Sequence, residues 1–398
     1  MDITIHPKKL NGTVQAIPSK SQAHRYLICA AFADKPTTIH CSQINQDITA
    51  TVCCLEKLGA KITRTDTDYI VNPIISTPNS CELDCGESGS TLRFLLPIIG
   101  ALGINAKIHM HGRLPQRPLS PLWEEMERNG CHLARLSNGS VQCSGRLMPG
   151  EYQISGAISS QFISGLLFAM SIMDGTSTLK ITEKLESAPY VKMTINTLRD
   201  FGVKVDAFQV AGRRRLSSPK SVSIEGDWSN GAFFLAAAAI GNKVVTENLQ
   251  SKSLQGDRAV LEFLTQLKSH ATISAADTPD LVPILTVVAA ANHGAVFTNI
   301  QRLRIKESDR VYAIESMLHS MGIRTESTEN SLTIYPGELK GGIINTHNDH
   351  RIAMSAAIAA TIATGPVTIL NAQCVAKSYP SFWEIYSNLG GNYEQHIR

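Results

Sequence analysis

Six segments of the chain are apolar on most faces, and they recur at similar intervals. They span residues 26–33, 91–102, 162–173, 232–240, 281–291 and 352–363. A helix that is apolar all round is a buried helix, so this pattern predicts six of them. Between these segments lie amphipathic stretches and short alternating stretches such as 177–182, which predict half-exposed helices and strands.

The amphipathic segments end at a glycine that is followed by a strand-like stretch. Such glycines occur at Gly59, Gly130 and Gly202, which are 71 and 72 residues apart, and again at Gly322 and Gly390, which are 68 residues apart. A nearly constant spacing is typical of structural repeats. Glycine suits the left-handed cap that ends many helices. The copy expected near residues 267–273 lacks it. Three repeats precede residue 225 and three follow it, which predicts two similar α/β domains with buried helices under small sheets.

Composition and charge exclude several classes of protein. The 398 residues are ample for two or three domains, and the net charge of +3 is too small to indicate a nucleic-acid partner. Residues 1–10 lack an apolar signal core, and no apolar run is long enough to cross a bilayer. We therefore expect a cytoplasmic protein without a membrane partner.

The nine cysteines show no spacing that is typical of a metal site. Cys29, Cys53 and Cys54 lie within helix-like segments. We interpret them as buried, reduced thiols.

Small polar or charged residues precede each buried helix, where Ser, Thr, Asp and Asn act as ordinary N-caps. Four cations lie at such positions as well: Lys20, Arg25, Arg93 and Arg351. The helix macrodipole disfavours positive charge at this end, and a bound anion would resolve the conflict. Two further basic stretches, 111–118 and 301–310, fit either anion binding or a solvated charged face.

Eight motifs occur along the chain in a fixed order. They are PSKSQAHR (18–25), GESGSTLR (86–93), QRP (116–118), ISSQF (158–162), PDLVP (279–283), RIKESDR (304–310), NDHRIAM (348–354) and AK (376–377). One such motif would be a weak signal, but the ordered set is specific. Over essentially its whole length the chain resembles the 5-enolpyruvylshikimate-3-phosphate (EPSP) synthases, a branch of the enolpyruvyl transferases.

The resemblance implies a fold of two domains, each of three βαβαββ repeats, joined by two crossings of the chain. The domains are then 18–225 and 1–17 plus 226–398, with the active-site cleft between them. It also implies the reaction. The enolpyruvyl group of phosphoenolpyruvate passes to the 5-hydroxyl of shikimate 3-phosphate, and phosphate is released through a tetrahedral intermediate. This step belongs to the shikimate pathway of aromatic amino acid biosynthesis.

Site residues follow from the resemblance, position by position. Those expected to bind shikimate 3-phosphate are Lys20, Ser21, Arg25, Ser159, Ser160, Gln161, Ser187, Tyr190, Asp280 and Lys306. Those expected to bind phosphoenolpyruvate are Lys20, Gly89, Arg117, Gln161, Arg310, Arg351 and Lys377. The implied base is Asp280, with Glu307 and Lys20 as proton-transfer partners. A plain N-cap remains an alternative role for Asp280.

The chemistry implied by the resemblance needs no metal and no organic cofactor, and we expect a monomer. Members of the family are targets of glyphosate, so inhibition that is competitive with phosphoenolpyruvate is expected. Two positions depart from a frequent Asn of the family, Glu87 and Arg302, and neither has an assigned role. For His350 a cap or a core histidine is favoured over a direct functional role.

Three other functions are compatible with parts of the sequence. The sister enzyme, UDP-N-acetylglucosamine enolpyruvyl transferase, usually carries a reactive Cys five residues before the Arg that matches Arg117, and this chain has Gly112 there. RNA 3′-phosphate-processing proteins share a related sub-fold but should show a richer basic surface. A catalytically inactive anion-binding homologue is the third alternative, and the intact candidate catalytic residues argue against it.

Overall fold

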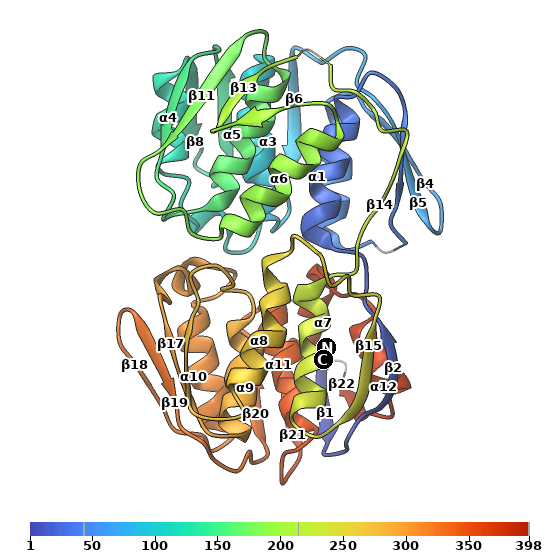
Figure 1. Ribbon diagram of the computed structural model, residues 1–398, viewed down its shortest axis with the longest axis vertical. Coiled ribbons are helices and arrows are strands. Elements are labelled where there is room, and N and C mark those ends of the chain that lie inside the picture. Colours follow the sequence, from blue (N-terminus) through green and yellow to red (C-terminus); the bar gives the residue numbers. More distant parts are fainter. Residues whose placement is uncertain (43, 214, 397–398) are drawn as a thin grey trace. The chain divides into compact units, whose positions relative to one another are not determined.

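A computed structural model describes residues 1–42, 44–213 and 215–396 of the chain. It divides into two compact units: the inserted unit, Pro18–Ile224, and the terminal unit, Met1–Ile17 with Glu225–Arg398. Each is drawn in Figure 1 in the colours of the sequence. Glu225, assigned by sequence to the first domain, belongs to the terminal unit, where the Gln255 Nε2 donates to its carboxylate at 3.3 Å.

The inserted unit contains three four-stranded sheets, and each has one parallel pair of strands followed by an antiparallel hairpin. The first sheet has the order β14-β3-β5-β4, with β14 Ser221–Ser223, β3 Thr37–His40, β5 Asp68–Asn72 and β4 Lys61–Arg64. The second is β6 Ser80–Asp84, β7 Asn105–His109, β9 Val141–Gly145 and β8 Cys131–Arg135. The third is β10 Glu151–Ile154, β11 Thr176–Ile181, β13 Gln209–Ala211 and β12 Val205–Asp206.

Three of the six α-helices described in this unit are almost wholly buried: α1 Lys20–Ala31, α3 Gly89–Leu102 and α5 Ser160–Ile172. The other three are half-exposed: α2 Gln46–Lys57, α4 Leu122–Arg128 and α6 Ala188–Asp200, and a short 3-10 helix η1 spans Leu114–Gln116. A Cβ at Gly165 would lie 2.1 Å from the Arg93 carbonyl oxygen. Only glycine there lets α5 approach α3 so closely.

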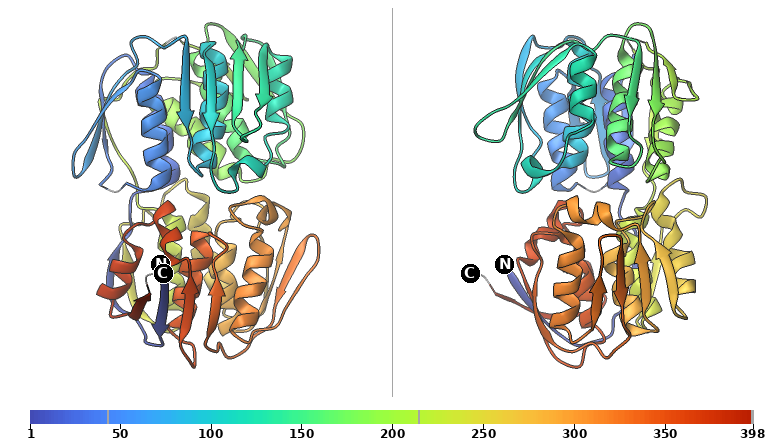
Figure 2. Two further views of the ribbon diagram at one scale, coloured as in Figure 1. Left: turned by 180° about the vertical axis from the view of Figure 1, so that it is seen from behind. Right: turned by 90° about the vertical axis from the view of Figure 1, so that its left-hand side faces the viewer.

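The terminal unit repeats this plan around both ends of the chain. One sheet is β16 Ala271–Ser274, β17 Ala295–Thr298, β19 Ser331–Ile334 and β18 Thr325–Ser327. Another is β20 Gly342–Asn345, β21 Val367–Leu370, β1 Asp2–His6 and β22 Asn392–His396. Figure 2 shows the blue N-terminal strand β1 among the red strands from the other end of the chain.

The third sheet described in the terminal unit is shorter and holds only β15 Lys243–Glu247 and β2 Asn11–Gln15, in parallel. Its second helix, α8 Val260–Gln266, leads directly to β16 of the next sheet. The hairpin is therefore missing from this repeat. This accounts for the absence of the helix-ending glycine near 267–273, and the repeat is not a full βαβαββ unit.

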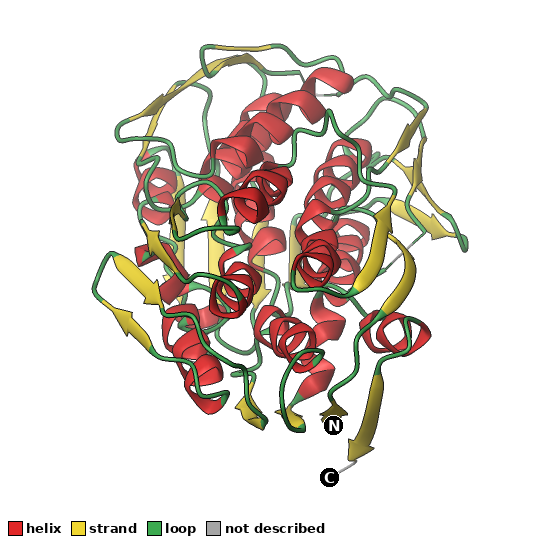
Figure 3. Ribbon diagram, turned by 60° about the horizontal axis from the view of Figure 1, so that its bottom comes forward, coloured by secondary structure: helices red, strands yellow, loops and turns green. Residues whose placement is uncertain are grey.

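The candidate functional residues of the terminal unit lie on its remaining helices or shortly before them. The buried ones are α7 Trp228–Ala239, α9 Val282–Ala291 and α11 His350–Ala360. The others are α10 Arg310–Ser320 and α12 Phe382–Asn388, with 3-10 helices η2 Gly256–Ala259, η3 Gln301–Ile305 and η4 Ala372–Lys377. In Figure 3 the helices of the chain are drawn in red and its strands in yellow.

The predicted glycine caps are confirmed, since all five glycines have positive φ. After α2, Gly59 N–H donates to the Glu56 carbonyl and Ala60 N–H to the Leu55 carbonyl, both at 3.0 Å. This pair of bonds is the Schellman arrangement, which satisfies the last carbonyls of a helix.

One of the three cysteine predictions is wrong. Cys29 and Cys54 are buried, but Cys53 is exposed because it lies on the outward face of the half-exposed α2, so that prediction was wrong. Within the described residues no helix is both long and apolar enough to cross a membrane. Nor do these residues contain a cluster of three or more side chains suited to hold a metal ion.

Candidate active site

In the inserted unit the start of α1 meets the start of α6 through Arg25, which is buried. Its Nε donates to the Thr194 hydroxyl at 2.8 Å, its Nη1 to the Ser21 carbonyl at 2.5 Å and its Nη2 to the Tyr190 carbonyl at 3.0 Å. Ser187, just before α6, has a φ of 53°, which is unusual outside glycine. Such strain often marks a functional position, and Ser187 is a predicted phosphate ligand.

The start of α5 carries three predicted ligands. Ser159 is the N-cap, and its hydroxyl accepts the Gln161 N–H at 3.3 Å, so an ordinary cap is present here. Gln161 Nε2 donates to the Ser90 hydroxyl at 2.9 Å, which joins α5 to α3. Ser160 is the buried first residue of the helix.

Gly89 and Arg117 come together around a buried arginine that the sequence analysis left without a role, Arg93. A Cβ at Gly89 would lie 2.7 Å from Arg93 Nη1 and 2.9 Å from Arg117 Nη1. Arg93 also donates to Gln161 Oε1 at 3.0 Å and to the Pro118 carbonyl at 3.1 Å. Three of the predicted phosphoenolpyruvate ligands therefore form one cluster, with Arg93 bonded to two of its segments.

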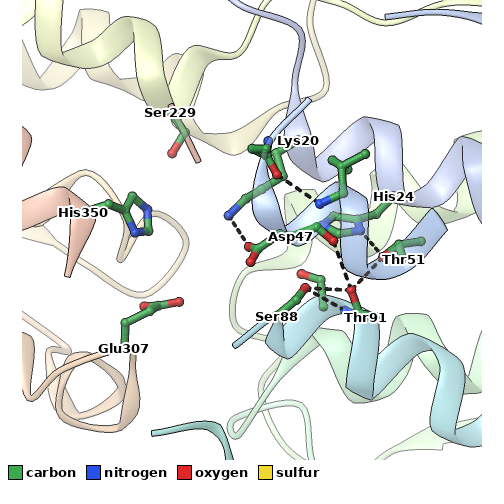
Figure 4. Close-up of polar contacts among 12 residues, drawn as sticks. Lys20, His24, Asp47, Thr51, Ser88, Thr91, Ser229, Glu307 and His350 are labelled. Atoms are coloured by element: carbon green, nitrogen blue, oxygen red, sulfur yellow. Dashed lines mark hydrogen bonds and ion pairs between the residues drawn. The ribbon is translucent and has the colours of Figure 1, made fainter. Parts of the chain in front are cut away.

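Lys20, the first residue of α1, is paired with Asp47 of α2. Their Nζ and Oδ2 atoms are 2.7 Å apart, and the side chains are 18% and 16% exposed (Figure 4). Glu87 lies against Gly112, where a Cβ would be 2.5 Å from the carboxylate. A cysteine could not stand at that position without displacing Glu87.

In the terminal unit Arg310 is the centre of the predicted site. Its side chain is 1% exposed, and it donates to three carboxylates: Asp349 at 2.8 Å, Asp280 at 2.6 Å and Glu307 at 2.5 Å. Burial opposes the charge, but these three carboxylates outweigh it and raise the pKa of Arg310. Asp349, the N-cap of α11, also accepts from the Ser308 hydroxyl at 3.0 Å.

Asp280 does not cap a helix, so the alternative role is wrong. The first residues of α9 have no side-chain cap, and the carboxylate is turned toward cations instead. It lies 3.5 Å from Lys306 and accepts from Arg351 Nη2 at 3.2 Å. Burial would raise the pKa of Asp280, but Arg351, Lys306 and Arg310 hold it well below its usual range.

Two neighbouring groups have shifted proton affinities. Burial lowers the pKa of the Lys306 ammonium to about 8, and Arg310 and Arg302 add to the shift against the pull of Asp280. Burial and the nearby Asp280 raise the pKa of Asp257 to about 6. A lowered pKa of an ammonium and a raised pKa of a carboxyl, both close to Asp280, are typical of a functional site.

The last two predicted cations also lie at helix ends. Arg351 Nη1 donates to the Asp280 carbonyl at 3.1 Å and its Nη2 to the Ser229 hydroxyl at 2.8 Å. Lys377, at the end of η4, donates to the Asn348 carbonyl at 2.7 Å. His350 is buried and follows the cap Asp349, which fits a core histidine.

The predicted residues thus gather into two clusters, one in each unit. Four residues in contact with them were not assigned a role from the sequence: Asp47, Arg93, Ser229 and Asp349. Arg93 and Asp349 lie inside recognised motifs, and a charge at a helix N-terminus was their signal. Asp47 and Ser229 had no sequence signal, because their partners are distant along the chain.

The family of the chain is decided by comparison with known proteins. The model of the family described as EPSP synthase (3-phosphoshikimate 1-carboxyvinyltransferase) matches residues 5–386. The chain belongs to the EPSP synthase family. Its relatives include the 3-phosphoshikimate 1-carboxyvinyltransferases of Clostridium novyi, 36% identical with 98% of each chain covered, and of Clostridium acetobutylicum, 38% identical with 98% of this chain and 97% of that one covered.

Solved structures agree with this membership of the EPSP synthase family. EPSP synthase from Acinetobacter baumannii superposes with a TM-score of 0.81 at 25% identity, with 99% of each chain covered. The predicted α/β fold class is confirmed. An enolpyruvyl transferase, NikO from Streptomyces tendae, has a TM-score of 0.78 at 20% identity, covering 100% of this chain and 99% of that one, and shows the fold alone.

Proposed function

We propose that this member of the EPSP synthase family joins phosphoenolpyruvate to shikimate 3-phosphate at the two clusters described above. The observation that carries the proposal is the ring of cations around Asp280 in the terminal unit, namely Lys306, Arg310 and Arg351. The cations suit two polyanionic substrates. The carboxylate among them suits a base for the hydroxyl that reacts.

Shikimate 3-phosphate is assigned to residues of both units. In the inserted unit Ser159, Ser160 and Ser187 hold the phosphate, because they stand at the starts of α5 and α6, where N–H groups favour anions. Gln161, Ser21, Arg25 and Tyr190 contact the rest of the molecule, and from the terminal unit Asp280 and Lys306 do so.

Phosphoenolpyruvate is assigned to Gly89, Arg117 and Gln161 in the inserted unit and to Arg310, Arg351 and Lys377 in the terminal unit, with Lys20 shared by both substrates. The 5-hydroxyl oxygen bonds to C2 of phosphoenolpyruvate while Asp280 accepts the hydroxyl proton. Glu307 or Lys20 delivers a proton to C3. The tetrahedral intermediate then loses phosphate, and a proton of the new methyl group returns to Glu307 or Lys20, while the cations stabilise the departing phosphate.

The setting of the reaction is also a proposal. We infer a cytoplasmic monomer that uses no metal, no organic cofactor and no nucleic acid. The inactive-homologue alternative is disfavoured because the candidate catalytic side chains are all present. The UDP-sugar alternative is disfavoured because Gly112 faces Glu87 and leaves no room for the cysteine of that enzyme.

One coupled assay tests the function. Purified protein is given phosphoenolpyruvate with and without shikimate 3-phosphate, and phosphate release is followed. We expect release only when both substrates are present. Release that does not depend on shikimate 3-phosphate would refute the assignment.

The division of ligands between the units predicts a change of shape on binding. Arg117 belongs to one unit and Arg351 to the other, so neither unit alone holds both substrates and the proposed cleft must close around them. X-ray scattering of the protein with shikimate 3-phosphate and a phosphoenolpyruvate analogue should show a smaller radius of gyration. Identical curves with and without ligands would contradict a site shared by two units.

The proposed role of Lys306 predicts a loss of substrate affinity at alkaline pH. Its ammonium form is present below a pKa of about 8 and is lost above it. The kcat/KM for shikimate 3-phosphate should therefore fall above pH 8, by about tenfold per pH unit. Lys306→Arg supplies a cation that does not titrate, so this variant should lose that limb of the profile. A limb that persists would belong to another group.

The surroundings of Gly89 predict how a substitution there changes inhibition by glyphosate. Inhibition competitive with phosphoenolpyruvate is expected, and Gly89→Ala would push a methyl group toward the guanidinium groups of Arg93 and Arg117. The inhibition constant should rise more than kcat falls. Gly365→Ala in the terminal unit is the control, since its φ is not positive and a Cβ there would lie at an ordinary contact distance, 3.5 Å from the nearest atom. If Gly89→Ala responds to glyphosate as the parent does, the pocket is assigned wrongly.

A further inference from the structure

The position of Lys20 is unfavourable for an ammonium group in two ways. Lys20 is the first residue of α1, and the N-terminus of a helix disfavours positive charge. Its side chain is long and flexible, so it loses rotamer entropy when it is fixed. Asp47 meets both needs, because its carboxylate lies 2.7 Å from the ammonium and stands in the first turn of α2, where negative charge is favoured.

The Lys20–Asp47 pair is one of two contacts between α1 and α2 that are a helical turn apart. His24 lies four residues after Lys20, and Thr51 lies four residues after Asp47. Residues four apart share a helix face. The His24 Nδ1 and the Thr51 hydroxyl are 2.8 Å apart and fully buried. The two contacts therefore join α1 to α2 at successive turns, and together they fix the register of the two helices (Figure 4). We call the buried His24–Thr51 contact the rung.

The buried rung continues into α3 as a chain of hydroxyl groups. The Thr51 hydroxyl lies 2.7 Å from the Thr91 hydroxyl, which donates to the Ser88 hydroxyl at 2.7 Å. Ser88 is the N-cap of α3, directly before Gly89. The Thr91 hydroxyl also lies 3.4 Å from the Asp47 carbonyl oxygen. The backbone that carries Asp47 is therefore tied to the start of α3, where Gly89 lies.

The direction of this chain fixes the state of His24. Because Thr91 donates to Ser88, Thr51 must donate to Thr91, and His24 must donate to Thr51 from a protonated Nδ1. Burial, with Lys20 and Arg25, lowers the pKa of His24 well below its usual value, so the ring is neutral. Nε2 is then an acceptor, and within the described residues it has no hydrogen-bond partner.

We propose that Asp47 is a positioning residue for Lys20, and that the buried His24–Thr51 rung holds Asp47 in the register that this task requires. The inference rests on the proposed function, in which Lys20 contacts both substrates and moves a proton. Asp47 acts only through Lys20. A displacement of about 1 Å in a reacting group can lower the rate about a hundredfold. A counter-ion that fixes the Lys20 ammonium would therefore protect the rate.

A double-mutant cycle tests the proposal. Asp47→Asn keeps the shape and removes the charge, and it should lower kcat by about 10–100-fold. The KM for phosphoenolpyruvate should not rise, because the ammonium loses a competing anion. In a Lys20→Met background the same change should alter kcat by less than about threefold, since the partner is already gone. Asp47→Ser, also suited to a helix start, is measured in parallel so that the result does not depend on one variant folding.

The rung and a control complete the test. Thr51→Val should lower kcat by about tenfold, and Thr51→Ser, which keeps the hydroxyl, should restore it. Asp68→Asn, which removes a carboxylate paired with His40 at 2.7 Å elsewhere in the unit, should leave kcat within about threefold. If the parent is active and Asp47→Asn lowers kcat by the same factor with and without Lys20→Met, the two residues act independently. The positioning inference alone is then overturned. An inactive parent would overturn the proposed function and this inference with it.

Discussion

Replacing Asp280 by asparagine is expected to leave a folded protein whose turnover falls by about 10²–10⁴-fold, the usual contribution of a general base. Asparagine keeps the size of the side chain, and its single amide oxygen can still accept from Arg310, but it cannot take the proton of the substrate hydroxyl. No helix cap is lost, because Asp280 caps none. The measurement is kcat by phosphate release, with calorimetric binding of shikimate 3-phosphate beside it.

Under the proposed mechanism, the surroundings of Asp280 predict that substrate binding precedes proton transfer. Without substrate, Arg351, Lys306 and Arg310 overcome burial and hold the pKa of Asp280 well below its usual range, so the carboxylate is a weak base. Anionic substrates that engage the same cations would weaken their hold on Asp280. Its affinity for a proton would then rise at the moment when the hydroxyl is in place.

A matched control separates this role from a general sensitivity of the region. Asp309→Asn makes the same chemical change at the N-cap of α10, where the aspartate accepts from Val311 N–H at 3.1 Å and Tyr312 N–H at 3.2 Å. Asparagine caps about as well, so turnover should stay within about threefold of the parent. An Asp280→Asn variant within roughly tenfold of the parent rate would move the role of base to another group, such as Glu307.

The repeats could be read from the sequence because each rests on a local pattern. Apolar segments marked the buried helices, and glycine marked the ends of the half-exposed ones. The shortened repeat also had a local signal in the sequence, because the glycine missing near 267–273 coincides with the missing hairpin. The exposure of Cys53 was misjudged because Cys53 and Cys54 are adjacent on α2, and adjacent helical residues point in different directions.

Apart from the resemblance, the sequence pointed to the candidate site only where a charge contradicted its local setting. Lys20, Arg93 and Arg351 are cations at helix N-termini, and that conflict was visible along the chain. The state of Asp280 was not visible, because a cap and a base share the same residue type in the same place. Its partners Lys306 and Arg310 lie far along the chain, and only the fold brings them to it.

Arg310→Met is expected to lower the free energy of unfolding of the terminal unit by about 3–5 kcal/mol, the usual cost of breaking a buried ion pair from one side. Methionine replaces the stem of the side chain but leaves Asp349, Asp280 and Glu307 without their shared partner. Activity should be lost as well. Denaturant titration read by a probe in the terminal unit measures the effect. The control is Arg304→Met, which removes a partly exposed pair with Asp309 at 3.6 Å and should cost less than about 1 kcal/mol.

The pH dependence of that difference identifies its cause. Burial raises and Arg310 lowers the pKa of Asp349, and the net shift is downward, as it is for Asp280. A carboxylate with a depressed folded-state pKa stabilises the fold above its unfolded-state pKa and loses this contribution as the pH falls. The gap in stability between parent and Arg310→Met should therefore be widest near neutral pH. Below about pH 4 it should shrink, because protonation relieves the unpaired carboxylates. A gap that is the same at pH 7 and pH 4 would mean that lost packing, and not lost charge, destabilises the variant.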